Sequence, residues 1–572
     1  MGLEAGPDGS LGYRTTQVRG LQEGSGVRAL RRAVKNKDRF LQAGGLTVQN
    51  DNAKPGHYSV LIVGFGPSGA VAAGLLGKKG HRTLVIDRLT DIYDKPRAIA
   101  VDHEILRHLD NMGIAGEVLR YTAPFTASEH FGAQGQLIRR IDMVPEPYPL
   151  GYTPSMVFTQ PPVEAVMREH AASFDCVEIS LGTELIGLSQ TDAIVSADIR
   201  EADGTVRKVT ADYVIGCDGA SSTVRQTAGI RLEDLIFDEP WLVIDVQANE
   251  SGLAKLPKAS AQFCSPSRPA SYIIGPKNHR RWEIMLLPGE NPHDMEKPEN
   301  VWKLLSRWIT PEDGSLWRAA AYRFHALVAD RWRERRILIA GDAAHQQPPF
   351  IGQGMCQGLR DVTNLVWKLD RVLKKQSPDS LLNTYGVERK RHVRELTGKI
   401  KAIGEVICIR DPEAAAARDE QLLAEGNGVP RTITRQEIVP PLQEGLLTAG
   451  ASDARGTLFP QPAILKDGGS VLLDHLTGAG WRLVIDGRSS VKASSFADTA
   501  KEIGLSVAAI VPAGEAETGT DMLVEEDSVM SGWFDRYGAA AALVRPDHYV
   551  FGAARDASEL ATQLGELKSC LG

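Results

Sequence analysis

Three closely spaced glycines occur in Gly64-Phe65-Gly66-Pro67-Ser68-Gly69. In a Gly-x-Gly-x-x-Gly pattern the first glycine permits a tight turn, the second admits a pyrophosphate, and the third lets a helix pack closely on a strand. The helix that follows offers N–H donors to a phosphate. Asp87, 18 residues after Gly69, can accept hydrogen bonds from both ribose hydroxyls of an adenosine. Glycine-rich turns are common, so the glycines predict a dinucleotide site only together with the flanking strand, helix and Asp87.

Two later stretches also deliver a carboxylate after a buried strand. The first is Asp218-Gly219, followed by Ser221, Ser222 and Arg225, and taken alone it is best interpreted as an ordinary turn. The second is Gly341-Asp342, followed by the loop 348–354 and a helix beginning near Met355. Backbone N–H groups of such a loop can bind an anionic or carbonyl-bearing ring. His345 beside it could be a base, although a structural histidine is the favoured interpretation.

Aromatic and basic residues gather in a fourth region, which alternates like an antiparallel sheet. They are Tyr272, Arg281, Trp282, Tyr322 and His325. Such side chains could line a pocket for an aromatic acid. The alternative is sheet packing with surface charge, and for any one of these residues that alternative is favoured.

The elements that would position these residues follow from hydrophobic periodicity. Short apolar strands at 58–63 and 82–87 flank a helix at 68–79, so the unit is βαβ and demands a parallel sheet covered by helices. Further elements are expected as a helix at 164–172, a hairpin of strands 194–200 and 206–214, strands 241–246 and 337–340, and helices 358–374 and 381–403. Strands 271–274 and 281–287, joined by a turn, indicate an antiparallel sheet inserted between parts of the parallel one.

The domain boundaries follow from these elements and from composition. We expect a mobile N-terminal extension at 1–57, a dinucleotide-binding domain at 58–410 with the substrate sheet inserted at about 230–330, a linker at 411–469, and a small α/β domain at 470–572. The linker is rich in Pro, Gly and Ala. The last domain carries strand patterns at 481–485, 507–511 and 541–545.

Composition excludes several classes of function. The 572 residues are 42% hydrophobic and 24% charged, and the net charge of −7 provides no general reason to bind nucleic acid. The six cysteines form no CxxC pair or Cys/His cluster, so neither a disulfide framework nor a metal site is indicated, and a cytoplasmic location fits. No apolar run reaches the ~18 residues of a membrane span. The N-terminus has no signal-peptide core, and Glu4, Asp8 and Glu23 disfavour an organelle-targeting peptide.

Taken in this order, the stretches resemble the single-component FAD-dependent aromatic hydroxylases, the class A flavoprotein monooxygenases. Four segments are most similar to the 3-(3-hydroxyphenyl)propionate hydroxylase branch, namely Arg281 to Glu290, Pro96-Arg97-Ala98, Asp102-His103-Glu104 and Gly354 to Gly358. The resemblance covers residues 58 to about 400. It implies an α/β fold: a Rossmann-like FAD-binding domain, an inserted antiparallel-sheet substrate domain and a C-terminal thioredoxin-like domain, here without CxxC.

The resemblance also implies residue roles toward FAD. The residues matched to the cofactor are Gly64, Gly66, Ser68 and Gly69 at the pyrophosphate, Asp87 at the ribose, Arg88 and Arg97 near the adenine and phosphates, Gln160 at the FAD, Asp218 and Gly219 serving FAD and the nicotinamide, Asp342 at the ribityl chain, and Pro349, Gly352, Gly354 and Met355 at the flavin ring. Cys356 departs from the family pattern, because many relatives carry Asn at that position.

The chemistry implied is oxygen transfer to a phenol. NADH or NADPH reduces the flavin, which reacts with O2 to a C4a-hydroperoxide that hydroxylates an electron-rich ring, while the protein positions the ring, removes its proton and excludes water. The expected partners are O2 and a small phenolic compound such as 3-(3-hydroxyphenyl)propionate, with a homodimer left open. Tyr272 and His325 are the candidates for helping the phenol to ionise, Arg281 is the candidate carboxylate partner, and His103 is the next candidate. A tailoring hydroxylase for a larger polyketide or quinone-like ring, or a non-hydroxylating flavin-dependent oxidoreductase, stays as an alternative.

Overall fold

The computed structural model describes residues 56–515 and 522–572. The predicted extension 1–57 lies outside the described residues, except for its last two positions. Its predicted end is one residue too late, because the first strand, β1, spans His57–Val63.

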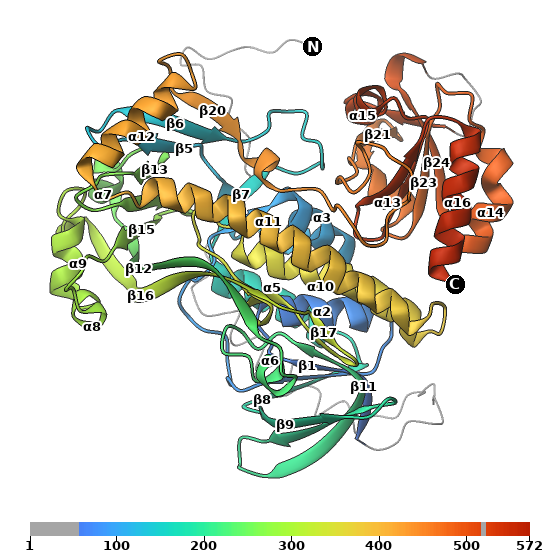
Figure 1. The fold of residues 1–572 in the computed structure, drawn as a ribbon, viewed down its shortest axis with the longest axis horizontal. Helices are drawn as coiled ribbons and strands as arrows, with labels where there is room; N and C mark the ends of the chain where they lie inside the picture. Colours follow the sequence, from blue (N-terminus) through green and yellow to red (C-terminus); the bar gives the residue numbers. More distant parts are fainter. Residues whose placement is uncertain (1–55, 516–521) are drawn as a thin grey trace. The chain divides into compact units, whose positions relative to one another are not determined.

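The predicted dinucleotide-binding part is built on a sheet with strand order β17-β18-β11-β1-β2-β8, which is parallel from β18 to β8 and has β17 antiparallel at one edge (Figure 1). Its strands are β1, β2 (Thr83–Asp87), β8 (Val177–Leu181), β11 (Val206–Gly216), β18 (Ile337–Ile339) and β17 (Arg333–Glu334), and β10 (Val195–Arg200) and β9 (Glu184–Gln190) extend it antiparallel from β11. The predicted βαβ unit and the 194–214 hairpin are confirmed. Because neighbouring parallel strands end at the same edge, the loops after β1, β11 and β18 meet there.

A nine-stranded sheet forms the inserted domain, in the order β19-β16-β12-β15-β14-β13-β5-β6-β20. Its strands are β12 (Leu232–Ala248), β16 (Gly314–Ala329), β15 (His279–Met285), β14 (Ala270–Ile274), β13 (Ser260–Phe263), β5 (Ser128–Phe131), β6 (Leu137–Asp142), β20 (Arg431–Thr434) and β19 (His345–Gln346). The predicted hairpin of 271–274 and 281–287 is its centre. The sheet is wider than the expected 230–330, and β13–β5 and β20–β6 are parallel pairs.

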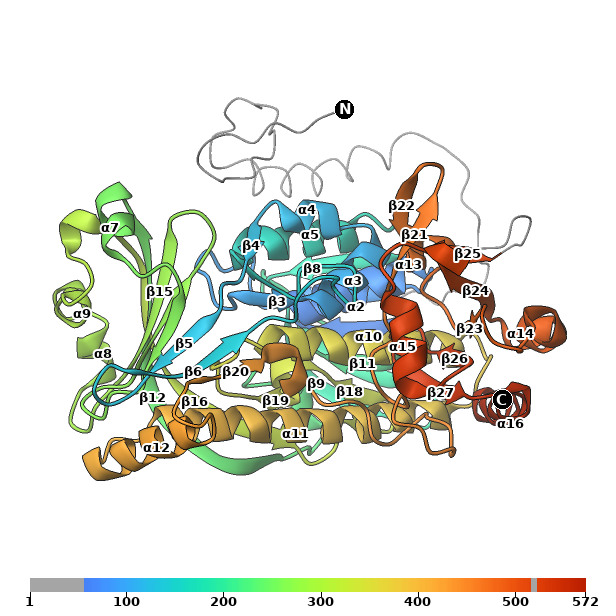
Figure 2. The ribbon, with the colours of Figure 1, turned by 90° about the horizontal axis from the view of Figure 1, so that it is seen from above.

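The two faces of this sheet have different neighbours. Figure 2 shows α7 (Glu250–Lys255) and α9 (Pro298–Leu305) on one side, with α10 (Gly354–Leu373) and α11 (Asn383–Ile407) on the other. Tyr272 and Trp282 pack with α9 on what we call the helix-facing face. Trp241, Met285 and Phe324 pack against Phe350 of the loop before α10 on the opposite, loop-facing face. Successive side chains along each strand point alternately to the helix-facing face and to the loop-facing face.

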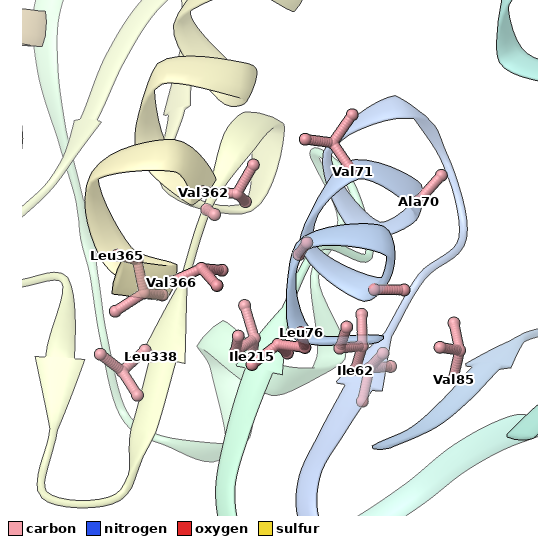
Figure 3. Packing of buried hydrophobic residues seen from close by; sticks show 14 of the residues in the cluster. Ile62, Ala70, Val71, Leu76, Val85, Ile215, Leu338, Val362, Leu365 and Val366 are labelled. Atoms are coloured by element: carbon pink, nitrogen blue, oxygen red, sulfur yellow. The ribbon is translucent and has the colours of Figure 1, made fainter. Parts of the chain in front are cut away.

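Helices cover the parallel sheet through a continuous apolar core. Figure 3 shows Leu76 of α2 (Pro67–Lys78) and Val362 and Val366 of α10 above Ile62 of β1 and Ile215 of β11. A further helix, α5 (Gln160–Ala172), packs on α2. A small sheet of β3 (Ala100–Asp102), β7 (Ser155–Phe158) and β4 (Thr122–Pro124) leads into α3 (His103–Met112) and α4 (Ala115–Leu119). No helix in the described ranges is long and apolar enough to span a membrane.

The segment predicted as a linker, 411–469, is more structured than expected. It contains α12 (Pro412–Ala424), and β20 pairs with β6, so it completes the inserted sheet before reaching the last domain. The composition of the segment conceals this pairing because β20 is short and polar and its partner is nearly 300 positions away in the chain.

The C-terminal domain is an α/β domain, as predicted, on a seven-stranded sheet with order β22-β21-β25-β24-β23-β26-β27. Its elements are β21 (Ala463–Lys466), β22 (Gly469–Leu472), α13 (Leu473–Thr477), β23 (Arg482–Asp486), α14 (Ala497–Ile503), β24 (Ser506–Pro512), β25 (Leu523–Glu525), α15 (Val529–Tyr537), β26 (Ala541–Val544), β27 (Val550–Ala554) and α16 (Ala557–Leu571). Buried ion pairs join it to α3 and α11, and a buried hydrogen bond from Asn364 to Asp547 joins it to α10.

Candidate active site

The glycine loop after β1 and the two stretches that contain Asp218 and Asp342 meet at the edge where β1, β11 and β18 end. A Cβ added to Gly64 would lie 2.3 Å from the carbonyl oxygen of Cys217, next to Asp218. A Cβ added to Gly341 would lie 2.9 Å from the hydroxyl of Ser68. Gly64 therefore lies against the backbone of the Asp218 stretch, and Gly341 lies against the side chain of Ser68. Both positions favour glycine, because their φ values are +99° and +62°.

Asp87 is tied to the glycine loop. Its carboxylate accepts hydrogen bonds from the backbone N–H of Phe65 at 2.7 Å and of Leu89 at 2.8 Å. These bonds hold the turn after β1 in place. The predicted contact of Asp87 with a ribose stays a prediction.

Two glycines at helix starts face open space. A Cβ on Gly66, before α2, or on Gly354, at the start of α10, would meet no atom within 4 Å. Neither helix has a side-chain hydrogen bond at its N-cap. The first N–H groups of both helices are thus available to a pyrophosphate and to a carbonyl-bearing ring, respectively.

Asp342 is an exposed carboxylate near Arg97. Enough protein surrounds it for desolvation to raise its pKa, while His345 and Arg97 act in the opposite direction. Gln160 accepts hydrogen bonds from the backbone N–H of Arg97 at 3.2 Å and of Ala98 at 2.6 Å. It therefore orients the segment that carries Arg97. The side chain of Arg97 is exposed, as is that of Arg88.

Two other candidates are held by the protein itself. Asp218 accepts hydrogen bonds from the hydroxyl of Ser222 and from the backbone N–H of Val224 at the start of α6 (Thr223–Thr227). His345 is buried, 2.8 Å from Asp361, and its ring is stacked on Trp332. This geometry supports the structural interpretation of His345.

Aromatic side chains link the inserted sheet to the loop 348–354, which we call the flavin loop because the resemblance places Pro349 and Gly352 at the flavin ring. The ring of Phe350 lies 5.7 Å from that of Trp241, 6.2 Å from that of Phe324 and 5.9 Å from that of Phe237, measured between centroids. Pro349 and Gly352 flank this ring in the chain and are half-buried. The loop-facing face is therefore apolar and aromatic next to the loop, as binding of an aromatic ring requires.

The expectation that Tyr272, His325 and Arg281 line one pocket is wrong. Tyr272 pairs with Trp282 and lies on the helix-facing face, where it is fully buried. His325 is opposite Asp238, one position away from Phe324, and therefore turns to the same side as Tyr272. Only Arg281 lies on the loop-facing face. One residue of register decides the face of a side chain, and the sequence does not show which face turns to the loop.

Arg281 is also not free to bind a substrate carboxylate. Its guanidinium donates to Asp245 at 2.7 Å and to the backbone carbonyls of Arg97 at 2.7 Å and Pro96 at 3.2 Å. Arg318 donates to the same carbonyl of Pro96. The two arginines thus fix the Pro96-Arg97 segment to the sheet. His103 is buried at the start of α3, and burial lowers its pKa to about 4.

Sequence reasoning missed two charged residues near the loop. Glu283, in the strand that contains Arg281, shares its face by alternation, which the sequence could have shown. Arg435 lies in the predicted linker, donates to the carbonyl of Ile351 and stands 4.8 Å from the ring centroid of Phe125. It has no ion pair with a described carboxylate, and desolvation lowers its pKa to about 10. Only the pairing of β20 with β6 brings it there.

These residues fit FAD. The open space beside Gly66 and the free N-terminus of α2 match a pyrophosphate, the accessible Asp342 matches a ribityl chain, and the open space beside Gly354 at the start of α10 matches a flavin ring. Gly64, Gly66, Ser68 and Gly69 would hold the pyrophosphate, Asp342 the ribityl hydroxyls, and Gly354 with Met355 the ring. When bound, FAD supplies the redox and oxygen-transfer chemistry that amino-acid side chains lack.

The comparisons with known proteins agree with this site. Residues 57–399 match the family described as FAD binding domain, and residues 456–568 match the HcaD C-terminal domain. The chain belongs to the FAD-dependent aromatic hydroxylases, which use a nicotinamide co-substrate.

Its relatives include two curated hydroxylases that it matches over almost their whole length. It is 36% identical to a probable NADH-specific resorcinol 4-hydroxylase of Rhodococcus jostii, over 89% of this chain and 94% of that protein. It is 33% identical to a 3-(3-hydroxy-phenyl)propionate/3-hydroxycinnamic acid hydroxylase of Burkholderia cenocepacia, over 88% and 95%.

Solved structures share the fold. The flavin-dependent monooxygenase PieE, in complex with FAD and substrate, aligns with a TM-score of 0.76 at 21% identity, over 91% of this chain and all of that one. Aklavinone-11 hydroxylase, with FAD and aklavinone, aligns with a TM-score of 0.74 at 23% identity and the same coverage. The predicted α/β fold class and the FAD cofactor are confirmed.

Proposed function

We propose that the protein hydroxylates a small single-ring phenol that carries a second substituent meta to its hydroxyl group. The observation that carries this proposal is what the relatives' names have in common. Resorcinol, 3-(3-hydroxyphenyl)propionate and 3-hydroxycinnamate are all phenols substituted at the meta position. The chain is 29–36% identical to hydroxylases named for these compounds.

The chain's own residues have three tasks in this reaction. The aromatic cluster of Trp241, Phe324 and Phe350 holds the ring of the substrate beside the flavin loop. Arg281 and Arg318 keep the Pro96-Arg97 segment in position beside the cofactor. The packed loop-facing face excludes water from the reacting atoms, as uncoupled loss of peroxide must be avoided.

The test is a substrate panel with the FAD-loaded protein. NADH and NADPH oxidation, O2 uptake and product mass are measured with resorcinol, 3-(3-hydroxyphenyl)propionate, 3-hydroxycinnamate, their para isomers and a polycyclic phenol. We expect the meta-substituted single rings to stimulate oxidation most and to gain one oxygen atom, with NADH preferred as in the Rhodococcus relative's name. Stimulation by the polycyclic phenol alone, or by no phenol, would overturn the proposal.

The proposal extends to O2, location and assembly. O2 is the source of the added oxygen, which incorporation of ¹⁸O from ¹⁸O2 tests directly. A cytoplasmic location is supported by the sequence, in which the six cysteines form no CxxC pair or Cys/His cluster. A homodimer through the C-terminal domain is the expected assembly, and light scattering of the purified protein distinguishes it from a monomer.

A further inference from the structure

Glu283 stands at the centre of the loop-facing face. On β15 it lies directly opposite Val243 of β12 on one side and Ser271 of β14 on the other. Along its own strand the residues that share its face are Arg281 and Met285. It is therefore surrounded by sheet on all sides, and its side chain turns toward the flavin loop.

Two different environments meet at Glu283. On one side lies the charged group of Asp245, Arg281 and Arg318, whose members bond to one another and to Pro96 and Arg97. On the other side lies the aromatic cluster with Met285, packed on Phe350. A phenol has the same division, since its ring is apolar and its hydroxyl polar.

The carboxylate of Glu283 has no hydrogen-bond or ion-pair partner among the described residues, although the residue is only 5% exposed. A buried carboxylate without a donor is costly, so a donor from outside the chain is the natural complement. The charged groups that face it are Arg281, Arg318 and Asp245, on β15, β16 and β12.

We propose that Glu283 accepts the proton of the substrate's phenolic hydroxyl. This inference rests on the proposed function. The phenolic O–H bond breaks, its electron pair stays on the oxygen as phenolate, and the proton forms an O–H bond with a carboxylate oxygen of Glu283. No electrons pass between the two molecules in this step. The negative charge left on the ring oxygen activates its ortho and para carbons.

Basicity favours this assignment. An ordinary glutamate, with a pKa of ~4.3, is a poor acceptor for a phenol with a pKa near ~10. Burial raises the pKa of Glu283 to about 7; Arg281 and Arg318 limit that rise and Asp245 adds to it. A base with a pKa near the working pH is the most effective general base, with a typical contribution of ~10²–10⁴ in rate.

The first experiment compares Glu283→Gln with Glu299→Gln as holoenzymes. Glu299 is an exposed residue of α9 on the other side of the sheet, so it controls for the loss of one carboxylate. With resorcinol at pH 7 we expect hydroxylation by Glu283→Gln to fall ~100-fold or more, with FAD content retained. Fluorinated resorcinols, which ionise at lower pH, should restore much of the rate in that variant alone.

The second experiment needs no turnover. Infrared difference spectra of the oxidised holoenzyme are recorded at pH 8, where Glu283 is mostly ionised, with and without a fluorinated resorcinol whose hydroxyl group has a pKa close to that of Glu283. Binding should produce the C=O band of a protonated carboxylic acid in wild type and Glu299→Gln, and none in Glu283→Gln. The spectra of wild type and Glu299→Gln test for the band by themselves, so this measurement does not depend on the folding of Glu283→Gln.

The outcomes separate the two proposals. If wild type makes hydroxylated product and Glu283→Gln does so at the same rate with every phenol, Glu283 is not the acceptor while the proposed function stands. A missing acid band in wild type has the same meaning. If wild type yields no hydroxylated phenol at all, the proposed function fails and this inference fails with it.

Discussion

Two buried glutamates illustrate opposite uses of a carboxylate. Glu388 of α11 is bonded to Arg545 at 2.6 Å and to Lys368 and Asn364 at 2.7 Å, at the junction with the C-terminal domain. Burial alone would raise its pKa, but these cations lower it to about 2. Glu283 is also buried, has no such partner among the described residues, and burial raises its pKa to about 7. Both glutamates are buried, so their partners decide whether the carboxylate stabilises the fold or is available to a ligand.

The same contrast extends over the surrounding regions. At the junction, Arg107 binds Asp474 at 2.7 and 2.8 Å, and Arg545 also binds Asp547 at 2.7 Å. Around the flavin loop, Glu283, Asp342 and Arg435 have no ion-pair partner among the described residues. Paired buried charges are expensive to break, whereas unpaired ones are retained at a cost that function must explain.

The largest effect is expected at the junction. Glu388→Ala leaves Arg545 and Lys368 buried without their shared carboxylate, so the free energy of unfolding should fall by ~3–5 kcal/mol. Urea unfolding followed by circular dichroism measures this. The control is Glu405→Ala on the same helix, where the pair with Lys401 is exposed and should contribute ~0.5 kcal/mol or less. An equal loss of unfolding free energy in Glu388→Ala and Glu405→Ala would contradict the special role of the buried ion pairs at the junction.

The pH dependence of stability should separate the two glutamates. The pKa of Glu283 is higher in the folded chain than its usual 4.5, so its stabilising effect is complete below pH 4.5 and is lost as pH rises to about 7. Relative to Glu283→Gln, wild type should lose up to ~3 kcal/mol over this range. Glu388, with its lowered pKa, loses its contribution only as pH falls from 4.5 toward 2.

This prediction is measured by thermal release of FAD fluorescence in wild type and Glu283→Gln at pH 5 and pH 8. The stability difference between the two proteins must change with pH. A stability difference that is the same at pH 5 and pH 8 would mean that Glu283 has an ordinary pKa, and it would contradict the contrast with Glu388.

Asp342→Ala should weaken FAD binding with little loss of protein stability. The side chain of Asp342 has no hydrogen bond to the described residues that could be lost, while the ribityl hydroxyls lose a charged acceptor worth ~1.5–3 kcal/mol, so the Kd for FAD should rise at least ~10-fold. Fluorescence titration of the apoprotein measures it, with the exposed Asp498→Ala as control. An unchanged Kd would remove Asp342 from the cofactor site.

The smallest effect on stability is expected for Arg435→Met. Replacing a buried cation that lacks a carboxylate partner with an apolar side chain of similar length should leave the free energy of unfolding within ~1 kcal/mol of wild type. It should, however, raise the apparent Michaelis constant for 3-(3-hydroxyphenyl)propionate more than for resorcinol, because only the former carries a carboxylate. Arg431→Met, which removes an exposed arginine of β20, is the control. A loss of stability as large as that of Glu388→Ala would place Arg435 with the junction residues.

Local sequence determined the cofactor side of this protein. The βαβ unit, the glycines at 64, 66 and 69 and the later Asp342 act through periodicity and turn geometry, which depend on near neighbours in the chain. Their order along the sequence was enough to indicate a family of FAD-dependent hydroxylases. The strands of the inserted sheet were also visible, because alternation reveals that a strand has two faces.

Tertiary structure decided the substrate side. Alternation places Tyr272 and Glu283 on opposite faces of neighbouring strands but does not say which face turns to the flavin loop. Packing of α9 on one face and of Phe350 on the other makes that choice. Arg435 reaches the loop only because β20 pairs with β6, and Glu388 meets Arg545 only when the C-terminal domain docks. Contacts between such distant segments have no local signature, because they depend on how complete surfaces fit together.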